Sequence, residues 1–265
     1  MWKFNLAACL GAGLLVIATF PASATSTAST TMTDIKFELT DLDPNDGIAP
    51  ALTFANGIPW AVYGYAADTL THETDTHLLE GRAFGTESGA VDAARNFASI
   101  HSGQSGDPFL GTAAMSAQGA AERTGYGLGW ATLHGDFTLT PNTRLTVTAH
   151  VTMVGATGGD GVEEVGSNYF LNVIGAGASN TLSHFLNAGP LPGDLPGVVR
   201  TYSFDQLLSA TVSNVTAASA AVSMDIGTNI SVINNMAVPE PGSWALMGLG
   251  LAGLWAAHAR RGRLG

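Results

Sequence analysis

Cysteine is almost absent from this chain of 265 residues, which contains only Cys9. Cys9 lies in an apolar segment near the N-terminus that we expect to be removed by cleavage. The remaining chain would then have no disulfide bond, no thiol nucleophile and no cysteine ligand for zinc. Its hydrophobic core alone must hold the fold together.

Charged residues are also scarce, and basic ones most of all. They make up 12% of the sequence, with 10 Lys and Arg against 21 Asp and Glu, for a net charge of −11. This sign excludes a nucleic-acid binder, because such proteins gain affinity by neutralising phosphates. The apolar content of 46% excludes a disordered chain. We therefore expect a folded protein with no nucleic-acid partner.

Residues 1–24 have the pattern of a secretory signal peptide. Lys3 precedes an apolar run from Leu6 to Phe20, and Ala22 and Ala24 form the small-residue pattern at which signal peptidase cleaves. The alternative is an N-terminal membrane anchor, but a run of 15 residues is short for a membrane span. The sequence predicts a signal helix, export, and cleavage after Ala24.

A second apolar segment, residues 244–259, lies near the C-terminus. As a helix its 16 residues would be about 24 Å long, against about 30 Å of bilayer hydrocarbon. The segment therefore predicts a short transmembrane helix. A buried terminal helix is the alternative, but the segment is apolar on all sides and ends abruptly in a basic cluster.

Distinctive residues flank this segment on both sides. The linker, residues 234–243, carries the motif Pro239, Glu240 and Pro241, and the tail, residues 260–265, carries Arg260, Arg261 and Arg263. Arginines beside a span stop its transfer and stay in the cytoplasm, so everything before Pro239 should lie on the other side of that membrane.

This arrangement, together with a signal peptide, resembles the PEP-CTERM sorting signal of Gram-negative bacteria. The apolar run is short, His258 interrupts its end, and Leu264 and Gly265 trail the arginines. The resemblance implies processing near Pro-Glu-Pro by an exosortase, a membrane-embedded cysteine protease-transpeptidase, after a transient stay in the inner membrane. It also implies an association with exopolysaccharide or biofilm matrix. It implies little about the residues before the linker.

The exported part is more acidic than the precursor. Without the four basic residues of the two ends it keeps six, and without Glu240 it keeps 20 acidic ones, so its net charge is near −14. Its first residues, 25–33, are rich in Ser, Thr and Ala and predict a flexible leader. We expect one folded domain over residues 34–233.

Alternating apolar and polar residues predict that this domain is all-β. The clearest alternation runs from Leu145 to Met153 and follows Ala131–Thr140, which predicts an antiparallel hairpin. Many such strands without strand–helix alternation indicate an antiparallel β-sandwich or jelly roll. Ser88–Phe97 is the best candidate for a short helix.

An Asp-rich segment is the candidate metal site. Asp41, Asp43, Asn45 and Asp46 place oxygen ligands at nearly alternate positions, as a calcium loop does. The pattern departs from an EF-hand, since Gly47 comes one position late and Leu52 stands at the twelfth position. The alternative is a polar turn, in which Asp, Asn, Pro and Gly are common anyway. No other cofactor is expected.

No constellation of catalytic residues is apparent. His72 and His77 are five residues apart, whereas a zinc-protease helix needs a spacing of four. Ser105 stands two positions after Gly103, as in the Gly-x-Ser-x-Gly motif of a nucleophile elbow. That motif also needs a glycine at position 107, where the chain has Asp107. His134 and His150 lie on the polar faces of their strands. We therefore expect that the protein is not an enzyme.

Seven aromatic residues could form a platform on which sugar rings stack, or could fill the core of a sandwich. They are Trp60, Tyr63, Tyr65, Tyr126, Trp130, Tyr169 and Tyr202.

The sequence thus predicts an exported protein of the cell surface or extracellular matrix with a structural or adhesive role. A polysaccharide-binding module is the first alternative and a surface hydrolase the second.

Overall fold

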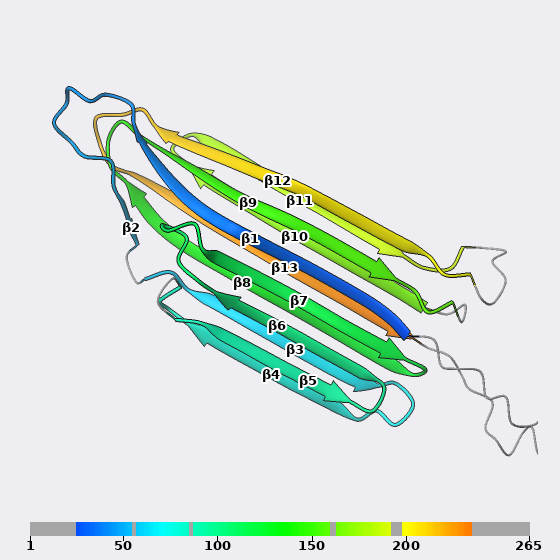
Figure 1. Ribbon diagram of the computed structural model, residues 1–265. Helices are drawn as coiled ribbons and strands as arrows, with labels where there is room; N and C mark the ends of the chain where they lie inside the picture. Colours follow the sequence, from blue (N-terminus) through cyan, green and yellow to red (C-terminus); the bar gives the residue numbers. More distant parts are fainter. Residues whose placement is uncertain (1–24, 55–56, 85–86, 160–162, 192–197, 235–265) are drawn as a thin grey trace, which may run out of the picture.

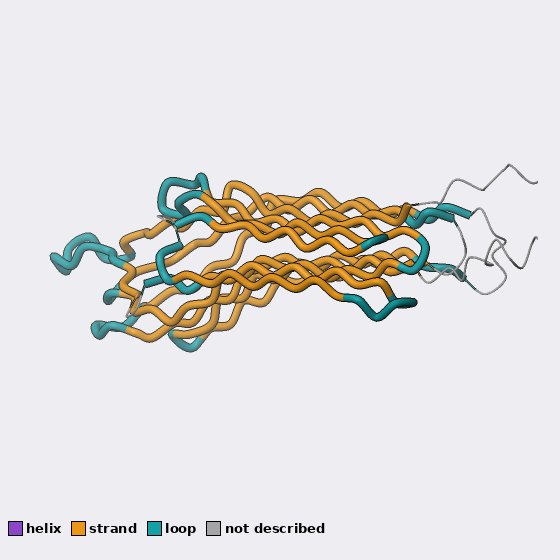
Figure 2. The backbone as a smooth tube through the Cα atoms, turned by 90° about the horizontal axis from the view of Figure 1, so that it is seen from below, coloured by secondary structure: helices purple, strands orange, loops and turns teal. Residues whose placement is uncertain are grey.

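The computed structural model describes residues 25–54, 57–84, 87–159, 163–191 and 198–234. In these ranges the chain forms β-strands joined by turns and loops, and no helix. The strands form two antiparallel sheets that lie face to face along one long axis (Figures 1 and 2). This confirms the expected all-β sandwich.

The first sheet has six strands in the order β12-β9-β1-β7-β6-β5. Their bounds are β1 Thr25–Asp41, β5 Gly89–Arg95, β6 Ala98–Ser105, β7 Ala113–Glu122, β9 Thr143–Ala156 and β12 Thr201–Asn214. The longest strand, β1, lies at the centre and pairs with β7 on one side and β9 on the other.

The second sheet has the strand order β11-β10-β13-β8-β3-β4, and short β2 pairs with the end of β8. The bounds are β2 Leu52–Phe54, β3 Trp60–Asp68, β4 Thr74–Gly81, β8 Gly125–Leu139, β10 Glu163–Gly175, β11 Ala178–Ala188 and β13 Ala220–Asn234. Strand β13, which leads to the linker, is thus central in its sheet.

Alternation along the strands builds the core between the sheets. In β9, Leu145, Val147, Ala149, Val151 and Met153 are all fully buried, while the residues between them face outward. Burial of one face of each strand is the main stabilising contribution in such a sandwich.

One half of the core is built from smaller residues than the other. Its buried cluster contains Ala28, Ala66, Ala93, Ala98, Ala117, Ala121, Ile100, Val165, Ala188, Ile230 and Val232. The sheets approach closely here, and Thr30 Oγ1 of β1 donates to the carbonyl of Asn229 in β13 at 3.4 Å. Small side chains at inward positions permit this approach.

Both ends of the folded domain lie at one end of the sandwich, which we call the terminal pole (Figure 1). Strand β1 begins there at Thr25, which pairs with Glu122, and β13 ends there at Asn234. The amide of buried Asn234 donates to Glu163 Oε1 at 3.1 Å, and Gly159 N donates to Glu163 Oε2 at 2.7 Å. These bonds hold the end of β13 in place against the start of β10.

Residues 25–33 are not a flexible leader, and this prediction is wrong. They form the first half of β1, with Ser26, Ala28, Thr30 and Met32 buried and both backbone edges paired. A Ser/Thr/Ala-rich segment resembles a linker in composition, but threonine favours strands and the closely spaced sheets accept small residues at inward positions. Residues 25–33 therefore belong to the folded domain.

The predicted hairpin and the predicted helix are also corrected. Strands β8 and β9 belong to different sheets, because the turn at Pro141 and Asn142 crosses the sandwich. Alternation shows which face of a strand is buried, but it does not identify the partner strand. Most of Ser88–Phe97 forms edge strand β5, where pairing with β6 overrides the helix propensity of alanine.

Several predictions concern residues outside the described ranges. They are the signal helix with Ala22 and Ala24, the helix over 244–259, the motif of Pro239, Glu240 and Pro241, and the arginines Arg260, Arg261 and Arg263. Within the described ranges, no helix is long and apolar enough to cross a membrane.

Candidate functional site

The Asp-rich segment forms a loop at the pole opposite the termini, which we call the free pole (Figure 1). Asp41 Oδ1 accepts the backbone N–H of Asp43 at 3.0 Å, and Asp43 Oδ1 accepts that of Asn45 at 3.2 Å. Asp46 accepts the N–H of Ile48 at 2.7 Å. These are the turns in which an Asp side chain bonds the backbone two residues ahead.

A bond from another turn holds the loop in place. Asn142 Nδ2 donates to Asp46 Oδ2 at 2.8 Å, and this bond, with that of Ile48 N–H, holds the pKa of Asp46 below its ordinary value. Among the described residues, no group of three or more His, Asp or Glu is placed to hold a metal ion. Calcium at Asp41, Asp43, Asn45 and Asp46 stays a prediction, which a calcium-dependent rise in melting temperature would support and an unchanged one would contradict.

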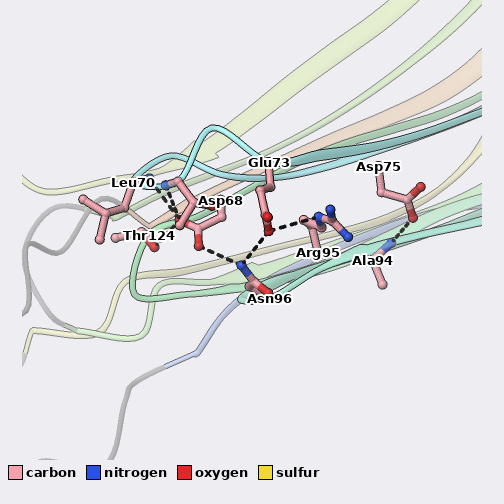
Figure 3. A network of polar contacts seen from close by, with 9 residues as sticks. Asp68, Leu70, Glu73, Asp75, Ala94, Arg95, Asn96 and Thr124 are labelled. Atoms are coloured by element: carbon pink, nitrogen blue, oxygen red, sulfur yellow. Dashed lines mark hydrogen bonds and ion pairs between the residues drawn. The ribbon is translucent and has the colours of Figure 1, made fainter.

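A network of polar contacts ties three turns together at the terminal pole (Figure 3). Its centre is Asp68, the last residue of β3, which is 2% exposed. Asp68 accepts hydrogen bonds from Leu70 N at 2.9 Å, Asn96 Nδ2 at 3.0 Å and Thr124 Oγ1 at 2.8 Å. These donors come from the β3–β4, β5–β6 and β7–β8 turns.

Hydrogen bonding decides the ionisation of Asp68. Burial acts to raise the pKa of its carboxyl group, but the bonds from Asn96, Thr124 and two backbone N–H groups outweigh burial and lower the pKa to about 2. Glu73 and Arg95 extend the network. Asn96 Nδ2 donates to Glu73 Oε2 at 3.4 Å, and Arg95 Nε lies 3.5 Å from the same carboxylate oxygen. No pattern in the sequence indicates this network, because its members lie up to 56 residues apart.

The structure does not bring the catalytic candidates together. His72 lies in the β3–β4 turn, while His77 lies in β4 and pairs with Asp75 at 3.0 Å. No hydrogen bond joins Ser105 to a histidine within the described ranges. His134 is exposed, as predicted, and lies 3.9 Å from Asp225. His150 also faces outward but is half-buried, with Asp205 at 2.5 Å.

A groove of about 720 Å³ crosses the outer face of the six-stranded sheet near the terminal pole. Its lining is mostly small, with Thr27, Ser99 and Ala120 among its outward residues. The largest polar feature is the pair of His101 Nδ1 and Asp92 Oδ1, 2.7 Å apart. This groove is concave, but it has few side chains that would recognise a ligand.

The seven aromatic candidates divide into two groups. Trp60 and Tyr169 are each 5% exposed and belong to the core. Tyr202 packs against the core, and its hydroxyl bonds Ser167 Oγ of the other sheet at 2.6 Å.

The other four lie half-buried on the outer face of the seven-stranded sheet, on β3 and β8. Tyr63 and Trp130 stack with ring centroids 5.3 Å apart and an interplanar angle of 17°. Tyr65 and Tyr126 meet edge to face at 5.7 Å. Burial, and then the nearby Tyr65 and Tyr63, raise the pKa of Tyr126. This face is the best-formed candidate binding surface of the described residues.

Comparison with protein families identifies one feature of the chain. Residues 237–261 match the PEP-CTERM protein-sorting motif, as the resemblance implied. Comparison with curated proteins and with solved structures finds no match. The motif implies an exported, membrane-anchored precursor that an exosortase processes, and the folded domain is not assigned to a family.

Proposed function

We propose that this protein is a surface or matrix component whose folded domain has a structural or adhesive role. The C-terminal segment holds the precursor in the inner membrane until an exosortase cuts near Pro239, Glu240 and Pro241. The domain then acts outside the cell, linked to exopolysaccharide or biofilm matrix.

The position of the sorting motif carries this proposal. The motif begins at residue 237, three residues after Asn234 ends β13, so the anchor would leave the domain at the terminal pole. The 15 residues of β13 span about 50 Å at roughly 3.3 Å per residue. A domain held in this way would place its free pole farthest from the anchor and leave both outer sheet faces accessible from the side.

Replacement of Pro239, Glu240 and Pro241 by alanine tests the sorting step. We expect an uncleaved precursor that stays in the inner-membrane fraction, measured by fractionation and immunoblotting. The matched control is Pro44→Ala in the exposed loop at the free pole, which should be processed like the unaltered protein. Unchanged processing and release of the triple variant would contradict the proposal.

The role of the released domain needs a separate test. Deletion of the gene should weaken the cohesion of biofilm or matrix, and the unaltered chain should restore it. The purified protein should not turn over ester or glycoside substrates, because no catalytic constellation forms among the described residues. Turnover that disappears in a Ser105→Ala variant would instead show a surface hydrolase.

A further inference from the structure

One row of outward side chains crosses the whole seven-stranded sheet from edge to edge. Strand register makes each member the direct neighbour of the next. The row consists of Leu78, Tyr63, Trp130, Asn229, Asn168 and Phe185. At about 4.8 Å between strands, its five steps cover about 24 Å. We call this set the transverse row.

The ends and the aromatic part of the row expose apolar surface to solvent. Leu78 is 54% exposed and Phe185 is 59% exposed. Between them Tyr63 and Trp130 stack on each other, and the neighbouring pair of Tyr65 and Tyr126 widens the aromatic surface. Scattered exposed apolar residues are ordinary, but the contiguous part of this set, from Leu78 through the aromatic rings, indicates a binding surface.

Two primary amides interrupt the apolar residues at the middle of the row. Asn229 and Asn168 are direct partners on β13 and β10. Neither side chain makes a hydrogen bond to another described residue. Each amide group offers two N–H donors and one oxygen acceptor, so the pair can bind hydroxyl groups of a ligand.

Charge decides which kind of polymer fits. No member of the transverse row is charged, while the exported part has a net charge near −14. Acidic side chains flank the row, with Glu80 on β4 and Glu164 on β10. An anionic polymer would be repelled, whereas a neutral one would not.

We propose that the transverse row binds an uncharged polysaccharide whose chain lies across the strands. Sugar rings present C–H groups on their faces, which pack against Tyr63 and Trp130, and hydroxyl groups at their rims, which bond Asn229 and Asn168. The inference rests on the proposed location outside the cell, where such polymers occur, and it names the surface through which an adhesive role would act.

Affinity electrophoresis of the full chain, purified in detergent, tests this surface. Native gels contain hydroxyethyl cellulose, dextran or, as the anionic comparison, alginate. We expect retardation by at least one neutral polymer and none by alginate. Trp130→Ala and Tyr63→Ala should each weaken the retardation about tenfold, since stacked rings dominate such contacts. Asn229→Ala should weaken it less.

The matched control is Val154→Ala, an exposed apolar residue on the opposite sheet, which should bind like the unaltered chain. Circular dichroism and the melting temperature of each variant show that it is folded, and Trp130→Phe should keep part of the binding.

Unaltered mobility in both neutral polymers, equal binding by Trp130→Ala, or retardation by alginate alone would overturn the inference. So would a dimer that Trp130→Ala abolishes, because a second copy would then be the occupant. None of these results depends on processing of the sorting motif, which fractionation tests separately.

Discussion

Turn residues at the terminal pole show how single side chains organise this fold. The β3–β4, β5–β6 and β7–β8 turns approach one another there, and buried Asp68 bonds donors from all three (Figure 3). A buried carboxylate is tolerated only when hydrogen bonds compensate for its lost hydration. Asp68 therefore stabilises the terminal pole, at which β13 ends.

Asp68→Asn should destabilise the domain at neutral pH. The folded-state pKa of about 2 lies below the ordinary 3.8, so Asp68 contributes stability that is fully present above about pH 4 and is lost as the pH falls through 2. The contribution is on the order of 2 kcal/mol. Urea unfolding at several pH values measures it.

The control for this variant is Asp136→Asn, which changes an exposed carboxylate on β8. It should leave the free energy of unfolding unchanged within about 0.5 kcal/mol. A difference between Asp68→Asn and the unaltered chain that is as large at pH 2 as at pH 7 would contradict the role given to the carboxylate.

A glycine at the same pole is required by close packing. A Cβ atom at Gly125 would lie 2.1 Å from the carbonyl oxygen of Phe97. That oxygen cannot move away freely, because it accepts the N–H of Glu122 at 2.7 Å. Gly125→Ala should therefore lower the free energy of unfolding by about 1–3 kcal/mol.

Gly103→Ala is the matched variant for the glycine prediction. The nearest atom to a Cβ at Gly103 is Ala90 Cβ at 3.4 Å, an ordinary contact. We expect no loss of stability there, measured by the same denaturant titration. Equal destabilisation by both variants would show that the contact with Phe97 O is not the cause.

Among the elements, β1 extends farthest beyond the predicted start of the domain, by the nine residues 25–33. Its first half pairs on both sides and buries Met32 completely. The segment is therefore part of the central strand of the six-stranded sheet. Signal-peptide cleavage after Ala24 would leave the mature chain beginning directly at this strand.

Met32→Ala should cost about 2–5 kcal/mol of stability, as expected for a methionine removed from a packed core. Thr31→Ala, one residue away on the outward face of the same strand, should cost less than about 1 kcal/mol. Thermal and denaturant unfolding measure both. A flexible leader would instead make the two variants equal and harmless.

Strands with large apolar residues could be predicted from the sequence, and those with small ones could not. Strand β9 alternates Leu, Val and Met with polar residues, so the predicted segment Leu145–Met153 lies within the observed strand Thr143–Ala156. Strand β7, with the sequence AAMSAQGAAE, has the same alternation, but alanine and glycine do not mark a buried face. Strand pairing was beyond prediction, because alternation says nothing about which strands are neighbours.

The candidate surface could be predicted only in part, for a similar reason. Four of the seven aromatic residues face outward and three do not, and this division depends on which face of β3, β8, β10 and β12 is turned to the core. Asn229 and Asn168 carry no signal in the sequence. Only the pairing of β13 with β10 places them together and in line with Trp130.

At the scale of the whole molecule, the two ends of the long axis differ. The two ends of the domain lie at the terminal pole, and the Asp-rich loop lies at the free pole (Figures 1 and 2). The proposed anchor leaves from the first, so distance from the membrane should increase along the strands. The transverse row crosses this axis, accessible from the side of the domain.

The most direct test of this orientation measures energy transfer from two labelled sites to the membrane. The precursor with alanine at Pro239, Glu240 and Pro241 is placed in vesicles that contain an acceptor lipid. Cys9→Ala makes a new cysteine the sole labelling site, at Thr71 in the β3–β4 turn or at Asn45 in the loop at the free pole. We predict strong transfer from the label at Thr71→Cys and weak transfer from the label at Asn45→Cys, which lies about 50 Å farther along the strands. Equal transfer from both sites, or stronger transfer from Asn45→Cys, would contradict a domain held at its terminal pole.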